Sequence, residues 1–197
     1  PIEIPAGTNG ASPSLSINYN SQGNRGNLGL GWSLSGLSSI SRSLKTIYHD
    51  SIVAPVTLSE TDRFVIDGMR LIATDGVYGE SETIYSKEMT DFSRVVSLGN
   101  LGNGPEWFRY ESKEGITMEY GNTVDSRFMS EDNSQVLVWS LNKMIWPDGN
   151  YIDFVYETID REHRIKEIKY TGNSLAGFDP YNKIEFIYAS SNFTFKT

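Results

Sequence analysis

From residue 60 onwards, short runs of alternating apolar residues are separated by turn sequences, and this pattern restricts the fold more than any other feature. Between residues 62–66 and 69–73 lies Asp67-Gly68, a dipeptide suited to the type I′ turn, in which both central residues need φ > 0. Three further pairs of runs follow, namely 107–112 with 116–120, 136–146 with 151–157, and 164–170 with 183–188. These hairpin pairings predict an all-β chain of antiparallel strands with little or no helix.

Residues 1–47 differ from the rest of the chain because they are dense in Gly, Ser and Asn and carry very little charge. Apolar side chains alternate from Leu15 to Tyr19, and again at Trp32 and Leu34. A period of two in a setting of Ser and Asn indicates strand rather than helix. The glycines between the two runs indicate a turn, followed by a strand with close backbone approaches or bulges.

The length and composition are those of one globular domain. The chain has 197 residues, of which 38% are apolar, and this is enough to bury a core. We therefore expect residues 1–197 to form a single domain of twisted antiparallel sheets, arranged like a sandwich or as a curved wall. Within it, residues 1–47 are a signature segment and residues 60–197 are the series of hairpins.

Charge and cysteine content exclude several classes of protein. The formal net charge is −8 without a basic stripe, so nucleic acid and anionic membrane surfaces are poor partners. No stretch approaches the roughly 18 apolar residues of a membrane helix, and residues 1–10 lack the pattern of a signal peptide. Because the chain begins with Pro1, we interpret it as a processed or trimmed piece. The absence of cysteine removes disulfides, thiol nucleophiles and Cys-based zinc sites.

Candidate catalytic groups are few and form no recognised motif. The chain has two histidines, His49 and His163, and residues 31–36 miss the G-x-S-x-G nucleophile elbow because residue 35 is serine. Residues 80–82 have the E-x-E pattern of arginine-modifying ADP-ribosyltransferases, but the arginine and the Ser-x-Ser strand that such an enzyme needs come in the wrong order. We therefore expect no enzyme, no catalytic residue, no cofactor site and no metal site.

An alternative function rests on the aromatic residues. Aromatic side chains suit the half-buried surface of a sheet, so most of them are expected to pack within it. A solvent-facing cluster would instead form a platform for a glycan or a receptor. Trp107, Trp139 and Trp146 are the candidate contacts of such a binding module, and the sequence does not show which rings face solvent.

Residues 28–42, LGLGWSLSGLSSISR, form a long and unusual run that resembles the opening of the SpvB-type N-terminal domain. Residues 5–21 resemble the start of the same domain. Further matches, in the family's order, are 62–64 with 67–71, 115–121, and 139–144 with 149–152. The resemblance covers nearly the whole chain and is least diagnostic over residues 75–105.

This resemblance implies a role that the residues alone do not reveal. In the family, the domain is the non-catalytic front part of a much longer polypeptide, as in RHS/YD-repeat proteins and the B components of Tc toxin complexes. It implies a structural and encapsulating module of a secreted or cell-surface bacterial protein. The implied partners are a β-propeller, an RHS shell and a C-terminal effector of the same polypeptide, or companion toxin subunits. No catalytic residue, cofactor or metal is carried over.

The signature segment is expected to act structurally. Its apolar anchors should be Trp32, Leu34, Leu37 and Ile40. Two of its glycines, Gly29 and Gly31, should allow close backbone approach. The full structural motif is Gly29, Gly31, Trp32, Leu34, Gly36, Leu37, Ile40 and Arg42.

Overall fold

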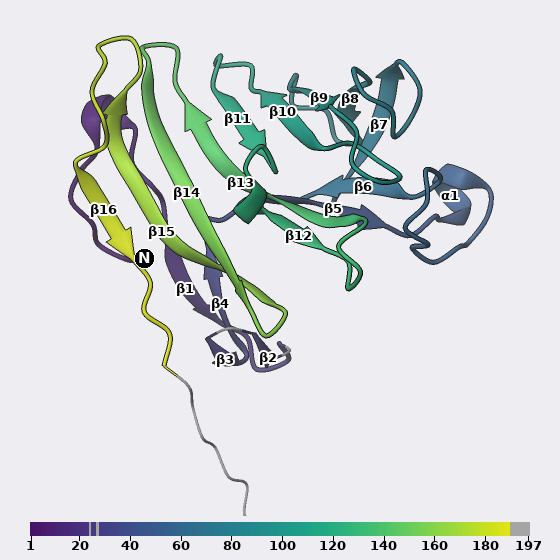
Figure 1. Ribbon diagram of the computed structural model, residues 1–197, viewed down its shortest axis with the longest axis horizontal. Helices are drawn as coiled ribbons and strands as arrows, with labels where there is room; N and C mark the ends of the chain where they lie inside the picture. The colour runs from purple at the N-terminus through teal and green to yellow at the C-terminus, as the bar shows by residue number, and fades with distance from the viewer. Residues whose placement is uncertain (24, 27, 190–197) are drawn as a thin grey trace, which may run out of the picture.

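The computed structural model of the protein describes residues 1–23, 25–26 and 28–189, and these are mostly strand (Figure 1). Helical structure in this part of the chain is limited to α1 (Ile47–Asp50) and two 3-10 turns, η1 (Thr8–Gly10) and η2 (Val124–Ser126). The strands are β1 (Ser16–Tyr19), β2 (Arg25–Gly26), β3 (Gly29–Leu30), β4 (Trp32–Ser35), β5 (Ser39–Ser43), β6 (Arg63–Ile66), β7 (Met69–Asp75), β8 (Ile84–Lys87), β9 (Arg94–Leu98), β10 (Trp107–Glu111), β11 (Thr117–Tyr120), β12 (Arg127–Met129), β13 (Val136–Ile145), β14 (Asn150–Ile159), β15 (Glu162–Asn173) and β16 (Asn182–Glu185). Their pairings are antiparallel, and the predicted all-β fold is confirmed.

Eight of these strands close into a barrel. Their hydrogen-bonded order is β11-β10-β9-β8-β7-β6-β5-β13, and β13 pairs in turn with β11, where Met118 lies opposite Met144. Closure removes the open sheet edges that would otherwise invite pairing with other chains. The sequence left a sandwich-like and a curved arrangement open. The structure is a sheet curved until its two ends meet.

A long extension leaves the barrel beside β13. Strand β14 pairs with β13 only at Lys143–Ile145, and then continues with β15 along its whole length. Strand β16 adds to the other side of β15. In Figure 1, β14 and β15 run from the top to the bottom of the view at the left of the barrel. The large sheet thus has two parts, a closed barrel and an open extension, which share β13.

The predicted turn chemistry is present at each tight hairpin. Asp67 and Gly68 both have positive φ, 48° and 82°, as a type I′ turn requires. Gly115 ends the β10–β11 loop at φ 80°, and Gly149 lies between β13 and β14 at φ 83°. The β14–β15 hairpin turns at Asp160 and Arg161, both non-glycine residues with positive φ (50° and 65°).

The least diagnostic stretch of the sequence contributes strands that complete the barrel. Strands β8 and β9 lie in residues 75–105, where no hairpin was predicted. The connection between β8 and β9, residues 88–93, has no glycine and so lacks the sequence of a tight turn. Val95 is fully buried and pairs with Tyr85 across the two strands. Tertiary packing therefore forms this pair of strands, and local turn signals do not mark it.

Aromatic rings fill the barrel. Trp139 and Phe108 meet edge to face with centroids 5.1 Å apart, and Phe64 packs against Trp139 in the same way at 5.5 Å. These three side chains are 0–1% exposed. Burying a large aromatic side chain stabilises the fold by about 1.5–3 kcal/mol. The interior is therefore packed core, as expected for a barrel of eight strands.

The signature segment forms a separate two-stranded sheet of β1 and β4. Ile17 pairs with Leu34, and Tyr19 pairs with Trp32, so these four side chains share one face of that sheet. The preceding residues run to the extension, where the Tyr170 hydroxyl donates a hydrogen bond to the Pro5 carbonyl at 3.0 Å. The segment therefore connects the small β1–β4 sheet with the long β14–β15 hairpin.

Candidate functional site

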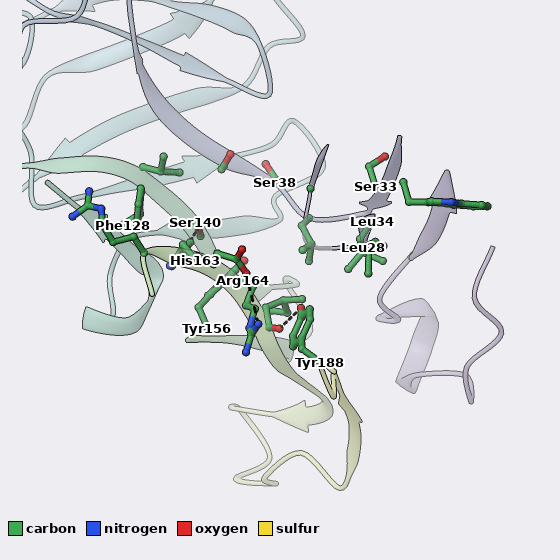
Figure 2. Close-up of a pocket in the computed structure, with 18 residues that line it drawn as sticks. Leu28, Ser33, Leu34, Ser38, Phe128, Ser140, Tyr156, His163, Arg164 and Tyr188 are labelled. Atoms are coloured by element: carbon green, nitrogen blue, oxygen red, sulfur yellow. Dashed lines mark hydrogen bonds and ion pairs between the residues drawn. The ribbon is translucent and has the colours of Figure 1, made fainter. Parts of the chain in front are cut away.

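A cleft of about 730 Å³ lies between the signature segment and the start of β15 (Figure 2). Figure 2 shows Leu28 and Leu34 on one side, and Tyr156 and His163 on the other. One wall consists of Gly26, Leu28, Trp32, Ser33, Leu34, Leu37, Ser38 and Ser39. The other consists of Phe128, Val138, Ser140, Tyr156, Arg161, Glu162, His163, Arg164, Ile165 and Tyr188. A recess of this volume, mostly apolar with a few polar groups, has the character of a ligand site.

An exposed aromatic pair stands at the signature wall. Trp32 is 45% exposed and Tyr19 is 60% exposed, and their ring centroids are 5.0 Å apart. They are cross-strand partners in β4 and β1. Trp32 was expected to anchor the core, but much of its ring faces solvent, because the β1–β4 sheet does not pack its whole apolar face.

The opposite wall holds His163 between two hydroxyl groups. Its Nε2 is 3.0 Å from Ser140 Oγ, and its Nδ1 is 3.0 Å from Thr158 Oγ1. Its ring stacks on Tyr156 with centroids 5.1 Å apart and planes 10° apart. Burial lowers the pKa of His163, against an opposing effect of the Asp125 carboxylate. Burial therefore favours the neutral imidazole, whereas the two hydroxyl groups can bond either protonation state of the ring.

This contact resembles part of a catalytic triad but differs from it at one position. In a Ser-His-Asp triad, Nδ1 donates to a carboxylate that stabilises the imidazolium. Here the Thr158 hydroxyl lies at Nδ1. The Asp125 carboxylate instead accepts a hydrogen bond from the Tyr156 backbone N–H at 2.9 Å. The arrangement holds the ring in place and supplies less support for a developing imidazolium charge.

Two arginines lie at the rim of the same wall. Arg164 stacks over Tyr188 at 4.1 Å and pairs with Glu157 at 2.8 Å. Arg161 lies over Phe128 at 5.8 Å, and it forms no ion pair with any carboxylate in the described ranges. The charge of Arg164 is thus neutralised within the protein, whereas Arg161 is exposed.

Glycine is needed for different reasons at different positions of the signature segment. A Cβ at Gly36 would lie 1.8 Å from the Ser14 carbonyl oxygen, and one at Gly31 would lie 2.5 Å from that of Asn20. Both positions also have positive φ, 103° and 76°. Gly29 has φ 107°, but a Cβ there meets nothing within 4 Å. Gly29 therefore differs from the expectation, since it supplies a backbone conformation and no close approach.

The remaining motif residues bring the segment to the core. Ile40 is completely buried in β5, and Leu34 and Leu37 pack against the core while they line the cleft. Arg42 is buried, and its Nη1 lies 3.2 Å from Asp62 Oδ2. Burial lowers the pKa of Arg42, and the adjacent Asp62 opposes that effect.

The three tryptophans named as ligand contacts do not form a shared platform. Trp139 is 0% exposed, and its indole N–H donates to the Glu106 carbonyl at 3.1 Å, so its place among the candidate ligand contacts was wrong. Trp107 is the first residue of β10. Trp146 follows Ile145, which pairs with Thr117 of β11, and Thr117 in turn pairs with Glu111, the last residue of β10. Trp107 and Trp146 therefore lie at opposite ends of that strand. The exposed pair Tyr19–Trp32 was missed, because the register of β1 against β4, which places both rings on one face, is not visible in the sequence.

The other candidate groups are held in structural contacts or in loops. Glu80 and Glu82 are exposed between β7 and β8. His49 lies within α1, and its Nε2 is 3.2 Å from Glu88 Oε1. Among residues 1–23, 25–26 and 28–189, no group of three or more His, Asp or Glu side chains is placed to hold a metal ion. The described helices are also too short to span a membrane.

Comparison with known proteins finds one matching family. The family described as Salmonella virulence plasmid 65kDa B protein matches residues 1–175. A search of curated protein sequences finds no match.

Solved structures share the fold at low sequence identity. The N-terminal domain of effector protein SpvB from Salmonella typhimurium strain LT2 has a TM-score of 0.65 and 21% identity, over 85% of this chain and 61% of that chain. A TcdB2-TccC3-TEV structure has a TM-score of 0.71 and 20% identity, over 100% and 11%. The Photorhabdus luminescens Tc holotoxin pore has a TM-score of 0.64 and 20% identity, over 80% and 8%. This chain thus spans 61% of the first structure and far less of the toxin chains.

Proposed function

Because the chain belongs to the SpvB family, we propose that it is a non-catalytic, structural and encapsulating N-terminal module of a secreted or cell-surface bacterial toxin of the RHS or Tc type. Its partners are then other parts of the same long polypeptide, namely a propeller, an RHS shell and a C-terminal effector, or companion toxin subunits. The solved TcdB2-TccC3 structures, in which the same fold is a small part of a large assembly, support this proposal.

The observation that carries the proposal is the combination of a filled barrel with an open sheet. The barrel interior is occupied by aromatic rings such as Trp139 and Phe108, which leaves no room for a substrate within it. The β14–β16 sheet, in contrast, extends outward from β13 and offers β16 for continuation of the sheet. A rigid body joined to an extendable sheet suits a wall segment.

The experiment that tests this proposal is to read the coding sequence beyond Thr197 in the source genome. We expect a propeller, YD repeats and a variable C-terminal effector in the same reading frame. A stop codon shortly after Thr197, or only adhesive repeats, would contradict the proposal.

A second candidate function is binding of a glycan or a host receptor. The observation in its favour is the exposed pair Tyr19–Trp32, of which Trp32 lines the cleft, since aromatic faces commonly stack on sugar rings. A glycan array probed with the wild-type chain and with Trp32→Ala tests this function. Array binding that disappears in the variant would favour it, and no binding on the array would remove it.

A further inference from the structure

We propose that a recess at the far end of β15 binds a quaternary ammonium group, such as the trimethylammonium head of choline. The recess has a volume of about 520 Å³, and its lining includes Asn150, Thr171, Asn173, Phe178, Asp179 and Tyr181. These residues belong to the start of β14, the end of β15 and the loop between β15 and β16, at the top left of Figure 1. The cleft described above borders the start of β15, so the two sites are separate. This inference does not depend on the encapsulating role.

Two exposed aromatic side chains flank a carboxylate in the loop that carries this recess. Phe178 is 66% exposed and Tyr181 is 76% exposed, and Asp179 and Pro180 lie between them in the sequence. Both rings line the recess together with Asp179. The face of an aromatic ring attracts cations, and groups of such rings recognise choline and methylated lysine. The lining therefore has the residue types that a quaternary ammonium group needs.

The charge at the recess is negative. Of the described residues that line it, none is lysine, arginine or histidine. The lysines of the neighbouring strands are already paired, since Lys169 and Lys183 lie 3.1 Å and 3.6 Å from the Glu167 carboxylate. Asp179 forms no ion pair with any cation in the described ranges. Its carboxylate is therefore available to balance the charge of a cationic ligand.

Three other polar side chains of the recess have partners within the protein. Asn173 Nδ2 donates to Asn150 Oδ1 at 3.0 Å, and Asn173 Oδ1 accepts from the Ala176 N–H at 2.8 Å. Thr171 Oγ1 accepts from the Tyr181 N–H at 3.2 Å. A sugar or a primary ammonium group needs several hydrogen-bonding partners, whereas a quaternary ammonium group has no N–H to satisfy. The lining therefore favours the quaternary cation.

The backbone beneath the two rings is fixed. Asn173 and Phe178 exchange two backbone hydrogen bonds, at 2.8 Å and 2.9 Å, which close the loop at Phe178. The Tyr181 N–H is held by the Thr171 hydroxyl, and the preceding residue, Pro180, has a fixed φ. A site on a fixed backbone loses little conformational freedom when its ligand binds, and this favours binding of a small ligand.

The conformation of Thr171 gives an independent argument. Thr171 has φ 79°, in the left-handed region, where a β-branched residue is an outlier. Its hydroxyl accepts from the N–H groups of Tyr181 and Asn182, each at 3.2 Å. The strained residue thus positions the segment that carries one of the two rings. Backbone strain of this kind clusters at ligand-binding sites.

Titration of the 197-residue chain with choline tests the proposal. Saturation-transfer NMR on the N-methyl protons of choline measures binding. We expect saturable binding with a Kd on the order of 1 mM, because both rings are largely exposed. The neutral isostere 3,3-dimethyl-1-butanol has the same shape without the charge and should bind about tenfold more weakly. Methylammonium should also bind more weakly, and glucose should not compete.

Three variants test the assigned residues. Asp179→Asn removes the charge and keeps the shape, so it should weaken choline binding about tenfold. Tyr181→Leu keeps an apolar side chain without an aromatic face and should also weaken binding. Leu175→Ala is the matched control, because Leu175 is 77% exposed in the same loop and does not line the recess. All three variants should keep the melting temperature of the wild type, which separates loss of binding from unfolding.

Vesicles distinguish the two sources of this headgroup. Cosedimentation with phosphatidylcholine vesicles that is reduced in Asp179→Asn would support a lipid headgroup as the ligand, whereas binding of free choline alone would support a soluble compound. Equal binding of choline and its neutral isostere would overturn the proposal, because the charge would then play no part. Absence of saturation up to about 20 mM choline, or equal losses in Asp179→Asn and Leu175→Ala, would overturn it as well.

Discussion

Arg42 and Asp62 form an ion pair inside the molecule, with Nη1 and Oδ2 3.2 Å apart and both side chains 2% exposed. The same guanidinium donates to the carbonyls of Val136 at 2.8 Å and Asn103 at 3.2 Å. It also lies 5.7 Å from the Trp139 ring centroid. Arg42 thus joins β5, two loops and the start of β13 at one end of the barrel core.

We expect removal of either partner of this pair to destabilise the fold strongly, because the other charge stays buried. Arg42→Met and Asp62→Asn should each lower the free energy of unfolding by about 3–5 kcal/mol. Urea denaturation followed by tryptophan fluorescence measures the effect. If Arg42→Met and Asp62→Asn combined lose much less stability than the sum of the two single losses, the pair acts as described. Single variants that lose less than about 1 kcal/mol would contradict this account.

The signature glycines offer a matched comparison. Gly36→Ala places a Cβ 1.8 Å from the Ser14 carbonyl oxygen at φ 103°, whereas Gly29→Ala meets open space at φ 107°. Gly29→Ala should therefore cost only the conformational term, about 1–2 kcal/mol. Gly36→Ala should cost at least ~3 kcal/mol, because the backbone must also move. Equal losses of stability in thermal unfolding would show that close approach is not what Gly36 provides.

Asp50 should make the fold sensitive to strong acid. Burial opposes ionisation of its carboxyl, but hydrogen bonds from Arg63, the Thr46 N–H and Arg70 outweigh burial and lower its pKa from 3.8 to about 2. The unfolded chain then takes up this proton first as pH falls. On the order of 1–2 kcal/mol of stability, present above about pH 4, should be lost between pH 4 and pH 2. Urea unfolding at several pH values should show this slope in the wild type and a smaller one in Asp50→Asn.

His163 should produce a separate slope at milder pH. Its pKa is lowered by burial, so the folded state resists protonation while the unfolded state accepts a proton near pH 6.5. Stability should therefore fall as pH decreases below about 6.5, and His163→Gln should flatten this part of the profile. Parallel profiles for the wild type and the variant between pH 7 and pH 5 would contradict the lowered pKa.

Local signals in the sequence account for the hairpins but not for the closure of the barrel. Asp67-Gly68 and Gly149 mark turns because their φ values need glycine or a tolerant residue, and these signals are readable in the chain. The pairing of Met118 with Met144, which closes the barrel, depends on strand curvature and register over many residues. No local pattern records it, so the sequence left the overall curvature open.

At the candidate site, too, the sequence predicted the strands but not the contacts that depend on tertiary packing. The alternation in residues 15–19 and 32–34 predicted strands, and the structure places Tyr19 beside Trp32 on one face. Burial of Trp139 was not predictable, since a tryptophan on a strand suits either face. The contact of Ser140 with His163 joins β13 and β15 and has no trace in sequence spacing.

Electron cryo-microscopy of the full-length natural protein tests the central claim most directly. The account predicts that the barrel and the β14–β16 sheet form part of a closed wall around an internal cavity, with further strands continuing from β16. A map in which this module stands apart from the rest of the polypeptide, as a separate appendage with both sheet faces in solvent, would contradict the proposed encapsulating role.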